Sequence, residues 1–199
     1  MKRRTISLFL FAMLLIVVLI PIVTVSAQET GGVRTPPTTS QEQEMNQRNT
    51  VPRNFTTEII ADDDEGRARA QRVIEVYEVL DNNPTIEGLR DYLADDYIQH
   101  NTLLPDGPEP LAMFFAAQVA EYPVEIDVHK VMVLGDWAMA HLNFRRTDTD
   151  DPNDLGIAVV DIFTFGPDGK LTEHWDVIQG VPTHSANPHG MFLRVRKED

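Results

Sequence analysis

Residues 157–179 read IAVVDIFTFGPDGKLTEHWDVIQ, and this stretch decides the fold class. Two strand-like runs, Gly156–Phe165 and Lys170–Gln179, flank the connection Gly166-Pro167-Asp168-Gly169. Glycine, proline and aspartate in a short connection between two such runs are typical of a β-hairpin. The stretch therefore predicts two long antiparallel strands joined by a tight turn.

The residues before this hairpin predict a second hairpin, preceded by helices. Gly135-Asp136 is a two-residue turn signal between apolar runs over Val124–Leu134 and Trp137–Arg145. Three earlier segments have helical spacing or helix-start signals: from Asp62–Glu65 to about Leu80, from Asn83-Pro84 through Leu89 and Leu93, and from about Glu109 to Glu121. Helices followed by a meander of strands predict an α+β domain with three N-terminal helices on one face of a mostly antiparallel sheet.

Several strands are apolar on both faces, so both faces of the sheet need cover. Ile157–Phe163 is the clearest example, with a single charged residue at Asp161. We expect the helices to cover one face around a pocket and a second subunit to cover the other, in a homodimer.

Residues 1–27 have the three parts of a secretory signal. Lys2, Arg3 and Arg4 precede an apolar run from Ile6 to Val25, and Val25-Ser26-Ala27 provides a small-residue cleavage site. The alternative is an uncleaved membrane anchor, because the apolar run approaches the ~20 residues that span a bilayer. Either interpretation predicts a secreted, periplasmic or otherwise extracytoplasmic protein that touches a membrane only through this segment.

Composition divides the rest of the chain into a linker and one domain. Residues 28–57 are rich in Thr, Gln, Asn and Pro, which predicts a disordered linker, and residues 58–199 have the length of one domain. The formal charge is −14 and becomes −17 without the three basic residues of the first segment. So acidic a surface argues against nucleic acid as a partner. The chain has no cysteine, which excludes disulfides, thiol catalysis and thiolate metal sites.

The apolar 157–179 hairpin carries charged residues that are candidates for chemistry. A carboxylate in an apolar strand is costly to bury unless it is paired or functional. His174 and Asp176 are two residues apart and face the same side of a regular strand, whereas the side that Asp161 faces depends on the register of the turn. The structural alternative places Glu173 and Asp176 at a strand end in solvent, with His174 as a satisfied structural residue.

A second candidate group lies in Tyr97-Ile98-Gln99-His100-Asn101, which we expect to form a short strand after a helix. It brings a phenol, an imidazole and an amide to one end of the sheet, and such groups orient a carbonyl or stabilise an enolate. The alternative is a capped strand end. The six histidines show no pair with the usual metal-ligand spacing, and no Gly-rich phosphate loop or serine-nucleophile turn is present, so we expect no metal and no cofactor.

These segments together resemble a known family. Residues 97–101 (YIQHN), 159–163 (VVDIF), 168–170 (DGK) and 173–179 (EHWDVIQ) are similar to the SnoaL-like polyketide cyclases of the nuclear transport factor 2-like superfamily. The tail 186–192 (ANPHGMF) resembles the ending of a bacterial subgroup described as SnoaL-like aldol-condensation enzymes. The resemblance covers roughly Glu65 to Phe192.

The resemblance implies a fold and a set of roles. The fold is a cone-shaped domain whose curved sheet wraps three helices, encloses a pocket and usually dimerises through its outer face. The family closes rings by aldol condensation without a cofactor, with an aspartate that corresponds to Asp176 as acid and base. Asp161, His100 and Asn101 correspond to groups that position the substrate. The resemblance gives His174 no assured role, and we retain His174 and Tyr97 as candidates for substrate contact from their places in the two segments.

The resulting hypothesis is a cofactor-independent lyase or isomerase acting on a small carbonyl compound. Asp176 would move a proton next to the carbonyl while His100 and Asn101 hold the developing oxyanion. The alternative is a non-catalytic module that binds a small apolar molecule in the same pocket, because a fold does not decide between the two. Hydrolysis of a strained substrate such as an epoxide is a third possibility.

Overall fold

The computed structural model describes residues 47–49, 51–187 and 189–192. The expected export segment 1–27 and residues 28–46 of the expected linker lie outside these ranges. No helix in the described ranges is both long and apolar enough to cross a membrane.

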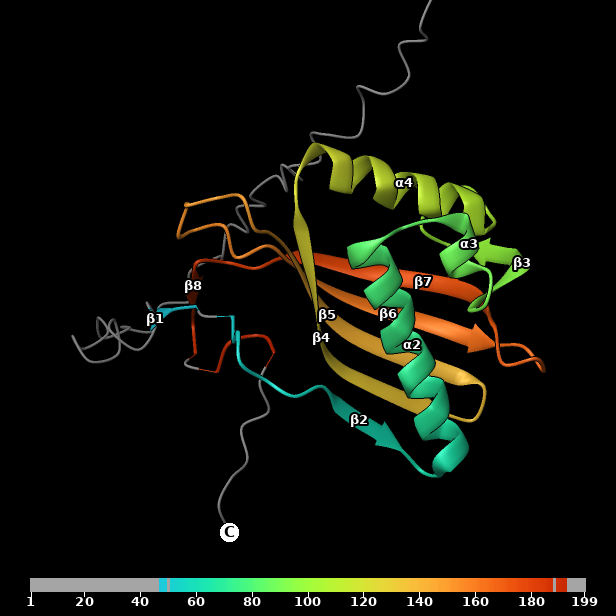
Figure 1. Cartoon of the computed structure of the whole chain (residues 1–199). Coiled ribbons are helices and arrows are strands. Elements are labelled where there is room, and N and C mark those ends of the chain that lie inside the picture. The colour runs from blue at the N-terminus through green and yellow to red at the C-terminus, as the bar shows by residue number, and fades with distance from the viewer. Residues whose placement is uncertain (1–46, 50, 188, 193–199) are drawn as a thin grey trace, which may run out of the picture. The chain divides into compact units, whose positions relative to one another are not determined.

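A six-stranded, curved sheet forms the body of the domain (Figure 1). Its strands, in spatial order, are β2 (Glu58–Ala61), β4 (Val124–Leu134), β5 (Trp137–Arg146), β6 (Ile157–Phe165), β7 (Leu171–Gly180) and β3 (Leu93–Gln99). The four central strands are antiparallel neighbours, whereas β2 pairs in parallel with β4 and β3 pairs in parallel with β7. The two predicted hairpins are confirmed, with strand bounds within one residue of those expected.

Three helices lie against one face of this sheet: α2 (Asp64–Asn82), α3 (Ile86–Leu89) and α4 (Pro108–Glu121) (Figure 1). Their apolar sides share one core with the sheet. Val73 and Leu89 from the helices are fully buried in it, as are Val131 and Leu142 from the strands. The α+β class with helices on one face is therefore confirmed, although β2 and β3 interrupt the order of helices before strands.

The expected start of the short helix is wrong. Thr85, not Asn83, is its N-cap, and the Thr85 side chain accepts a hydrogen bond from the Gly88 N–H at 3.1 Å. The helix ends at Leu89, and Leu93 begins β3 instead of continuing the helix. A threonine oxygen two residues after Asn83 satisfies a free N–H group of the first turn, and this outweighs the proline signal.

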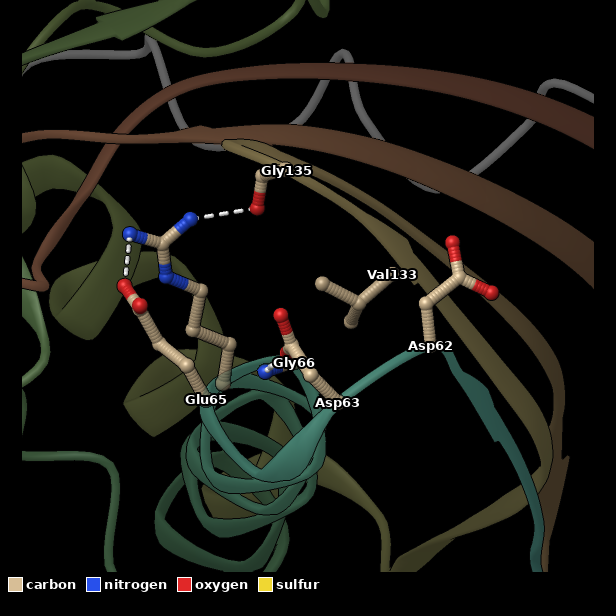
Figure 2. Close-up of a pocket in the computed structure, with 7 residues that line it drawn as sticks. Asp62, Asp63, Glu65, Gly66, Val133 and Gly135 are labelled. Carbon is tan, nitrogen blue, oxygen red and sulfur yellow. Dashed lines mark hydrogen bonds and ion pairs between the residues drawn. The ribbon is translucent and has the colours of Figure 1, made fainter.

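The acidic run before α2 has a structural role. Asp63 caps the helix by accepting from the Gly66 N–H at 2.7 Å. The Arg69 guanidinium donates to the Glu65 carboxylate, at 2.6 Å, and to the carbonyl of Gly135 in the β4–β5 turn. Figure 2 labels these two acceptor residues. Two carboxylates of the small hollow in Figure 2 thus have structural partners. Asp63 caps α2, and Glu65 pairs with Arg69, whose hydrogen bond to Gly135 connects α2 to the sheet.

The opposite face of the sheet is partly covered by the two ends of the described chain. β1 (Gln47–Arg48) pairs with β8 (His184–Ser185), and Val51, Val181 and Phe192 pack on Ala158 of β6. Residues 47–49 and Val51, which composition assigns to a linker, therefore belong to the packed structure. Val51 anchors this segment, and a composition average over the thirty residues 28–57 does not reveal one buried anchor.

Candidate active site

The register of the β6–β7 hairpin brings the candidate residues together. Asp161 is directly opposite Asp176, and Phe163 is directly opposite His174. Directly opposite residues share a face, so all four side chains point to the side of Val159, which packs in the core with the helices. The register that the sequence left open is therefore the one that unites Asp161, His174 and Asp176.

Asp161 is a buried carboxylate with two partners. Asp161 is only 5% exposed. The Tyr77 hydroxyl of α2 donates to Oδ2, and Nε2 of His174 lies 3.2 Å from Oδ1. These contacts offset the cost of burying the charge in an otherwise apolar strand.

His174 lies between Asp161 and Gln99. Its Nδ1 is 2.7 Å from Oε1 of Gln99, a residue directly opposite it on β3. The imidazole also stacks on the Phe163 ring, with 5.0 Å between the ring centres. Both ring nitrogens are thus engaged and the ring plane is fixed.

Asp176 is half-buried, which makes it the most accessible of the three. Nδ2 of Asn101 donates to its Oδ2, and Oδ1 of the same amide accepts from the Leu103 N–H at 2.9 Å. One side-chain nitrogen or oxygen from each of Asp161, His174 and Asp176 lies within 4.8 Å of the others. The structure therefore forms a compact group of two carboxylates and one imidazole.

Two buried phenols border this group. Burial, together with the Asp161 carboxylate, raises the pKa of Tyr77 well above its ordinary value. Burial followed by the charges of Asp161 and Asp176 does the same to the pKa of Tyr97. Both phenols therefore stay protonated and remain hydrogen-bond donors beside the carboxylates.

His100 does not join the group, which changes its expected role. It stacks on Trp175 with ring centres 4.4 Å apart, and its Nε2 lies 3.1 Å from a carboxylate oxygen of Glu173. Trp175 and Glu173 alternate with His174 and Asp176 along β7, so they face the other side of the sheet. Asn101, one residue further, is the member of the predicted pair that reaches Asp176.

Gln99 and Tyr77 belong to the site but were not among the candidates. Gln99 is two residues from both Tyr97 and Asn101, so the three side chains face the same side of a strand. The same period of two that united His174 with Asp176 could therefore have identified Gln99. Tyr77 lies on the apolar side of α2, where its spacing predicts only a core residue. Nothing in the local sequence indicates that its hydroxyl reaches a strand 84 residues away.

The donor set could in principle hold a divalent cation. One imidazole nitrogen and two carboxylate oxygens are ligand types that Zn²⁺, Fe²⁺ or Mn²⁺ accept. Sequence spacing did not indicate such a set, because Asp161 comes from the neighbouring strand of the hairpin. Asp161 and His174 already pair with each other, and His174 also contacts Gln99. Asp176 is held through one oxygen by Asn101.

The fold and this site place the protein in a class of small α+β domains with a polar group between helices and a curved sheet. A family model described as the SnoaL-like domain matches residues 70–174, more than half of the chain, and the protein belongs to this family. The match includes Asp161 and His174 and ends two residues before Asp176. A search of curated proteins returned no match to the sequence.

The chain is also similar to solved structures. A proposed polyketide cyclase from Bacillus cereus ATCC 10987 is 18% identical with a TM-score of 0.52, over 68% of this chain and 88% of that one. TsrD from Streptomyces laurentii is 21% identical with a TM-score of 0.46, over 56% of this chain and 89% of that one. An LEH-like epoxide hydrolase from M. tuberculosis is 16% identical with a TM-score of 0.46, over 57% and 84%. At 18% identity, the likeness to the Bacillus cereus structure concerns the fold alone.

Proposed function

We propose that this SnoaL-like domain is a cofactor-independent lyase or isomerase that moves a proton next to the carbonyl group of a small compound. The observation that carries the proposal is the pair of opposed carboxylates, Asp161 and Asp176, with different partners and different exposure. Two carboxyl groups whose environments differ can take different roles in acid–base chemistry.

Asp176 is the base in this proposal. It is half-buried, and only its Oδ2 is held, by Asn101. Within the described residues its Oδ1 has no hydrogen-bond partner, which leaves this oxygen for a substrate proton. Asp161 is unsuited to the role because both of its oxygens are engaged.

The oxyanion that forms when a proton leaves carbon needs a hydrogen-bond donor. Tyr97 is the best candidate, because burial and the charges of Asp161 and Asp176 raise its pKa and keep its phenol protonated. Asn101 can add its amide N–H after Asp176 has taken up the proton. His100, stacked on Trp175 and facing the other side of the sheet, has no part in this step.

A non-catalytic binding module is the second candidate. The observation that favours it is that His174 contacts both Asp161 and Gln99 through its ring nitrogens. A purely structural polar network also requires its members to be paired in this way. In that case Asp176 and Asn101 would orient a small apolar ligand without turning it over.

We also propose that the domain works outside the cytoplasm, on the basis of the signal-like residues 1–27. N-terminal sequencing of protein recovered from the medium or periplasm tests this directly. A mature chain that begins at Gln28 is the expected result, whereas a chain that stays in the cytoplasm with Met1 contradicts the proposal.

Turnover of a panel of β-dicarbonyl, enone and epoxide compounds tests the catalytic proposal. Wild type should convert at least one carbonyl compound, and Asp176→Asn should bind it with similar affinity but lose about 100-fold or more in kcat. Binding without conversion by either protein would favour the binding module. Conversion of epoxides alone would replace proton transfer at carbon with activation of water.

A further inference from the structure

We propose that Asp161, His174 and Asp176 bind a divalent transition-metal ion such as Zn²⁺, and that the bound ion blocks the base of the site. This deepens the proposed function as a regulation of the same site, and its catalytic consequence rests on that function. Binding of the ion does not rest on it, because binding depends only on the three ligand side chains and their partners.

The ligand atoms lie close to the separations that one ion requires. Zn²⁺ binds imidazole nitrogen and carboxylate oxygen at about 2.0–2.2 Å in tetrahedral sites, which places two ligand atoms of one ion about 3.3–3.6 Å apart. Nε2 of His174 lies 3.2 Å from Oδ1 of Asp161. One donor atom from each of the three residues lies within 4.8 Å of the others, so a movement of at most about 1.5 Å by Asp176 completes the set.

The imidazole of His174 is oriented to bind an ion through Nε2. The backbone N–H of Asn101 donates to Oε1 of Gln99 at 3.1 Å, which identifies this atom as the amide oxygen. Oε1 lies 2.7 Å from Nδ1 of His174, so Nδ1 donates to it and a neutral ring keeps its lone pair on Nε2. Histidines that bind metals almost always donate their other ring N–H to an oxygen in this way.

The two carboxylates are held in the same manner, by donors outside the group. The Tyr77 hydroxyl donates to Oδ2 of Asp161, and Nδ2 of Asn101 donates to Oδ2 of Asp176. Each carboxylate therefore has one oxygen fixed from outside and the other left for the group. Such outer partners orient the ligands of a metal site and raise its affinity.

The charge of the group favours a divalent ion. Asp161 and His174 are 5% and 8% exposed, so water reaches little of this part of the group. Within the described residues, neither Asp161 nor Asp176 forms an ion pair with a lysine or arginine. A divalent cation supplies the two positive charges that balance two carboxylates. Three protein ligands also leave a coordination position open to water or a small ligand.

The bound ion and the proposed proton transfer exclude each other. In the proposed function Asp176 accepts a proton from the substrate, whereas in the metal-bound site its oxygen lone pair is shared with the ion. The domain is therefore active without the ion and inhibited by it.

Calorimetric titration with Zn²⁺ tests the site without any substrate. After treatment with EDTA, wild type without a histidine tag should bind one ion per chain with a Kd in the micromolar range or tighter. Asp176→Asn and His174→Gln each remove a ligand and should weaken binding at least about 100-fold, the upper limit for loss of an outer partner. Asp176 is half-buried, so its variant keeps the test valid even if His174→Gln does not fold.

His100→Gln is the matched control for these variants. His100 and Glu173 form another histidine–carboxylate pair, at 3.1 Å, on the other face of the sheet. The control should change the Kd for Zn²⁺ by less than about threefold. The proposal would be overturned by a wild type that binds no Zn²⁺ up to about 100 μM, by wild-type affinity in Asp176→Asn, or by a loss of binding in His100→Gln.

Gln99 is a positioning residue in this proposal, because it acts through His174. Gln99→Leu removes the acceptor of Nδ1 and should weaken Zn²⁺ binding about 10- to 100-fold. Gln99→Glu keeps an oxygen at this position and should bind Zn²⁺ at least as tightly as wild type. Equal losses of affinity in the two variants would contradict the role of Gln99.

Hydrogen exchange of a substrate with D₂O separates this proposal from the proposed function. Zn²⁺ binding without exchange or turnover by the EDTA-treated protein would refute the proposed function and leave the metal site standing. Exchange without Zn²⁺ binding would do the reverse. If both hold, saturating Zn²⁺ should slow the exchange at least about 10-fold. Exchange that is unchanged or faster with Zn²⁺ would contradict the competition for Asp176.

Discussion

At the scale of single residues, Asn101 and His100 are neighbours in the chain whose side chains meet opposite faces of β7. Asn101 donates to Asp176 within the candidate site, whereas His100 stacks on Trp175. Strand alternation alone produces this difference, because His174 and Asp176 lie on one face and Glu173 and Trp175 on the other.

This separation predicts different effects for two alanine variants. Asn101→Ala removes a hydrogen bond to a charged group, which is worth about 1.5–3 kcal/mol, so kcat/KM should fall about 10- to 100-fold. His100→Ala should change kcat/KM by less than about threefold, because its ring faces Trp175 and Glu173 on the other side of the sheet from Asp161 and Asp176. Steady-state kinetics on one converted compound measures both. A larger loss for His100→Ala than for Asn101→Ala would mean that the strand face is misassigned.

How much of the site could be predicted from the sequence depends on which relations are local. The period of two united His174 with Asp176 and could have included Gln99 with Asn101. The pairing of Asp161 with Asp176 required the register of the hairpin, and a shift of one residue would have separated them. The contact of Tyr77 with Asp161 joins a helix to a distant strand, and local spacing holds no information about it.

At the scale of elements, turn signals and apolar runs predicted the four central strands well. The edge strands were harder: β2 is only four residues long, and β3 follows a helix that appeared to continue to Leu93. Both pair in parallel with strands distant in the chain, so their partners supply the stabilisation that their own sequence does not indicate.

We expect substitution of Gly156, the residue just before β6, to have a large effect on stability. Gly156 has φ of +74°, and a Cβ at this position would lie 2.1 Å from the carbonyl oxygen of Phe144 on β5. Gly135 also has positive φ, at +60°, but nothing lies within 4 Å of a Cβ there. Gly156→Ala should therefore lower the free energy of unfolding by about 2 kcal/mol more than Gly135→Ala does.

Urea unfolding of both variants measures the difference. Gly135→Ala is the matched control because it carries the backbone strain without the clash. Equal losses of stability would show that strand β5 moves aside without cost and that Gly156 matters only for its backbone angles.

At the scale of the whole domain, the buried residue His129 links stability to pH. His129 lies between the rings of Phe55 and Phe192, 4.1 and 4.5 Å away, and its Nε2 has no hydrogen-bond partner within the described residues. Burial, followed by the charges of His141 and Lys130, lowers the pKa of His129 from 6.5 to about 4. The unfolded chain takes up this proton more readily, so stability falls as the pH drops from about 6.5 to about 4.

His129→Phe should remove this part of the pH dependence while keeping the aromatic stack. The free energy of unfolding of the variant should exceed that of wild type by a margin that grows by about 2 kcal/mol between pH 7 and pH 4. Thermal or urea unfolding at both pH values measures the margin, and subtraction removes the groups common to both proteins. A margin independent of pH would mean that His129 is accessible to protons in the folded state.

The uncovered part of the outer sheet face bears on assembly. Leu134, Trp137 and Ile60 are 72%, 50% and 45% exposed and line a shallow apolar groove. We propose that this groove packs against a second copy of the chain, since the outer face must be covered somewhere.

Light scattering tests the dimer. The mature chain should have about twice its monomer mass at micromolar concentration, and Trp137→Glu should reduce it to the monomer. Met113→Glu, at a residue that is 65% exposed on α4, is the control and should leave the mass unchanged. A wild-type monomer would refute the dimer.

The most direct test of proton transfer by Asp176 is exchange of substrate hydrogen with D₂O. Incubated with a carbonyl compound that it binds, wild type should exchange the hydrogens next to the carbonyl at least about 100-fold faster than Asp176→Asn does. Proton NMR of the compound follows the exchange even when no product accumulates. Equal exchange by wild type and Asp176→Asn, with binding intact in both, would contradict the assignment of Asp176 as the base.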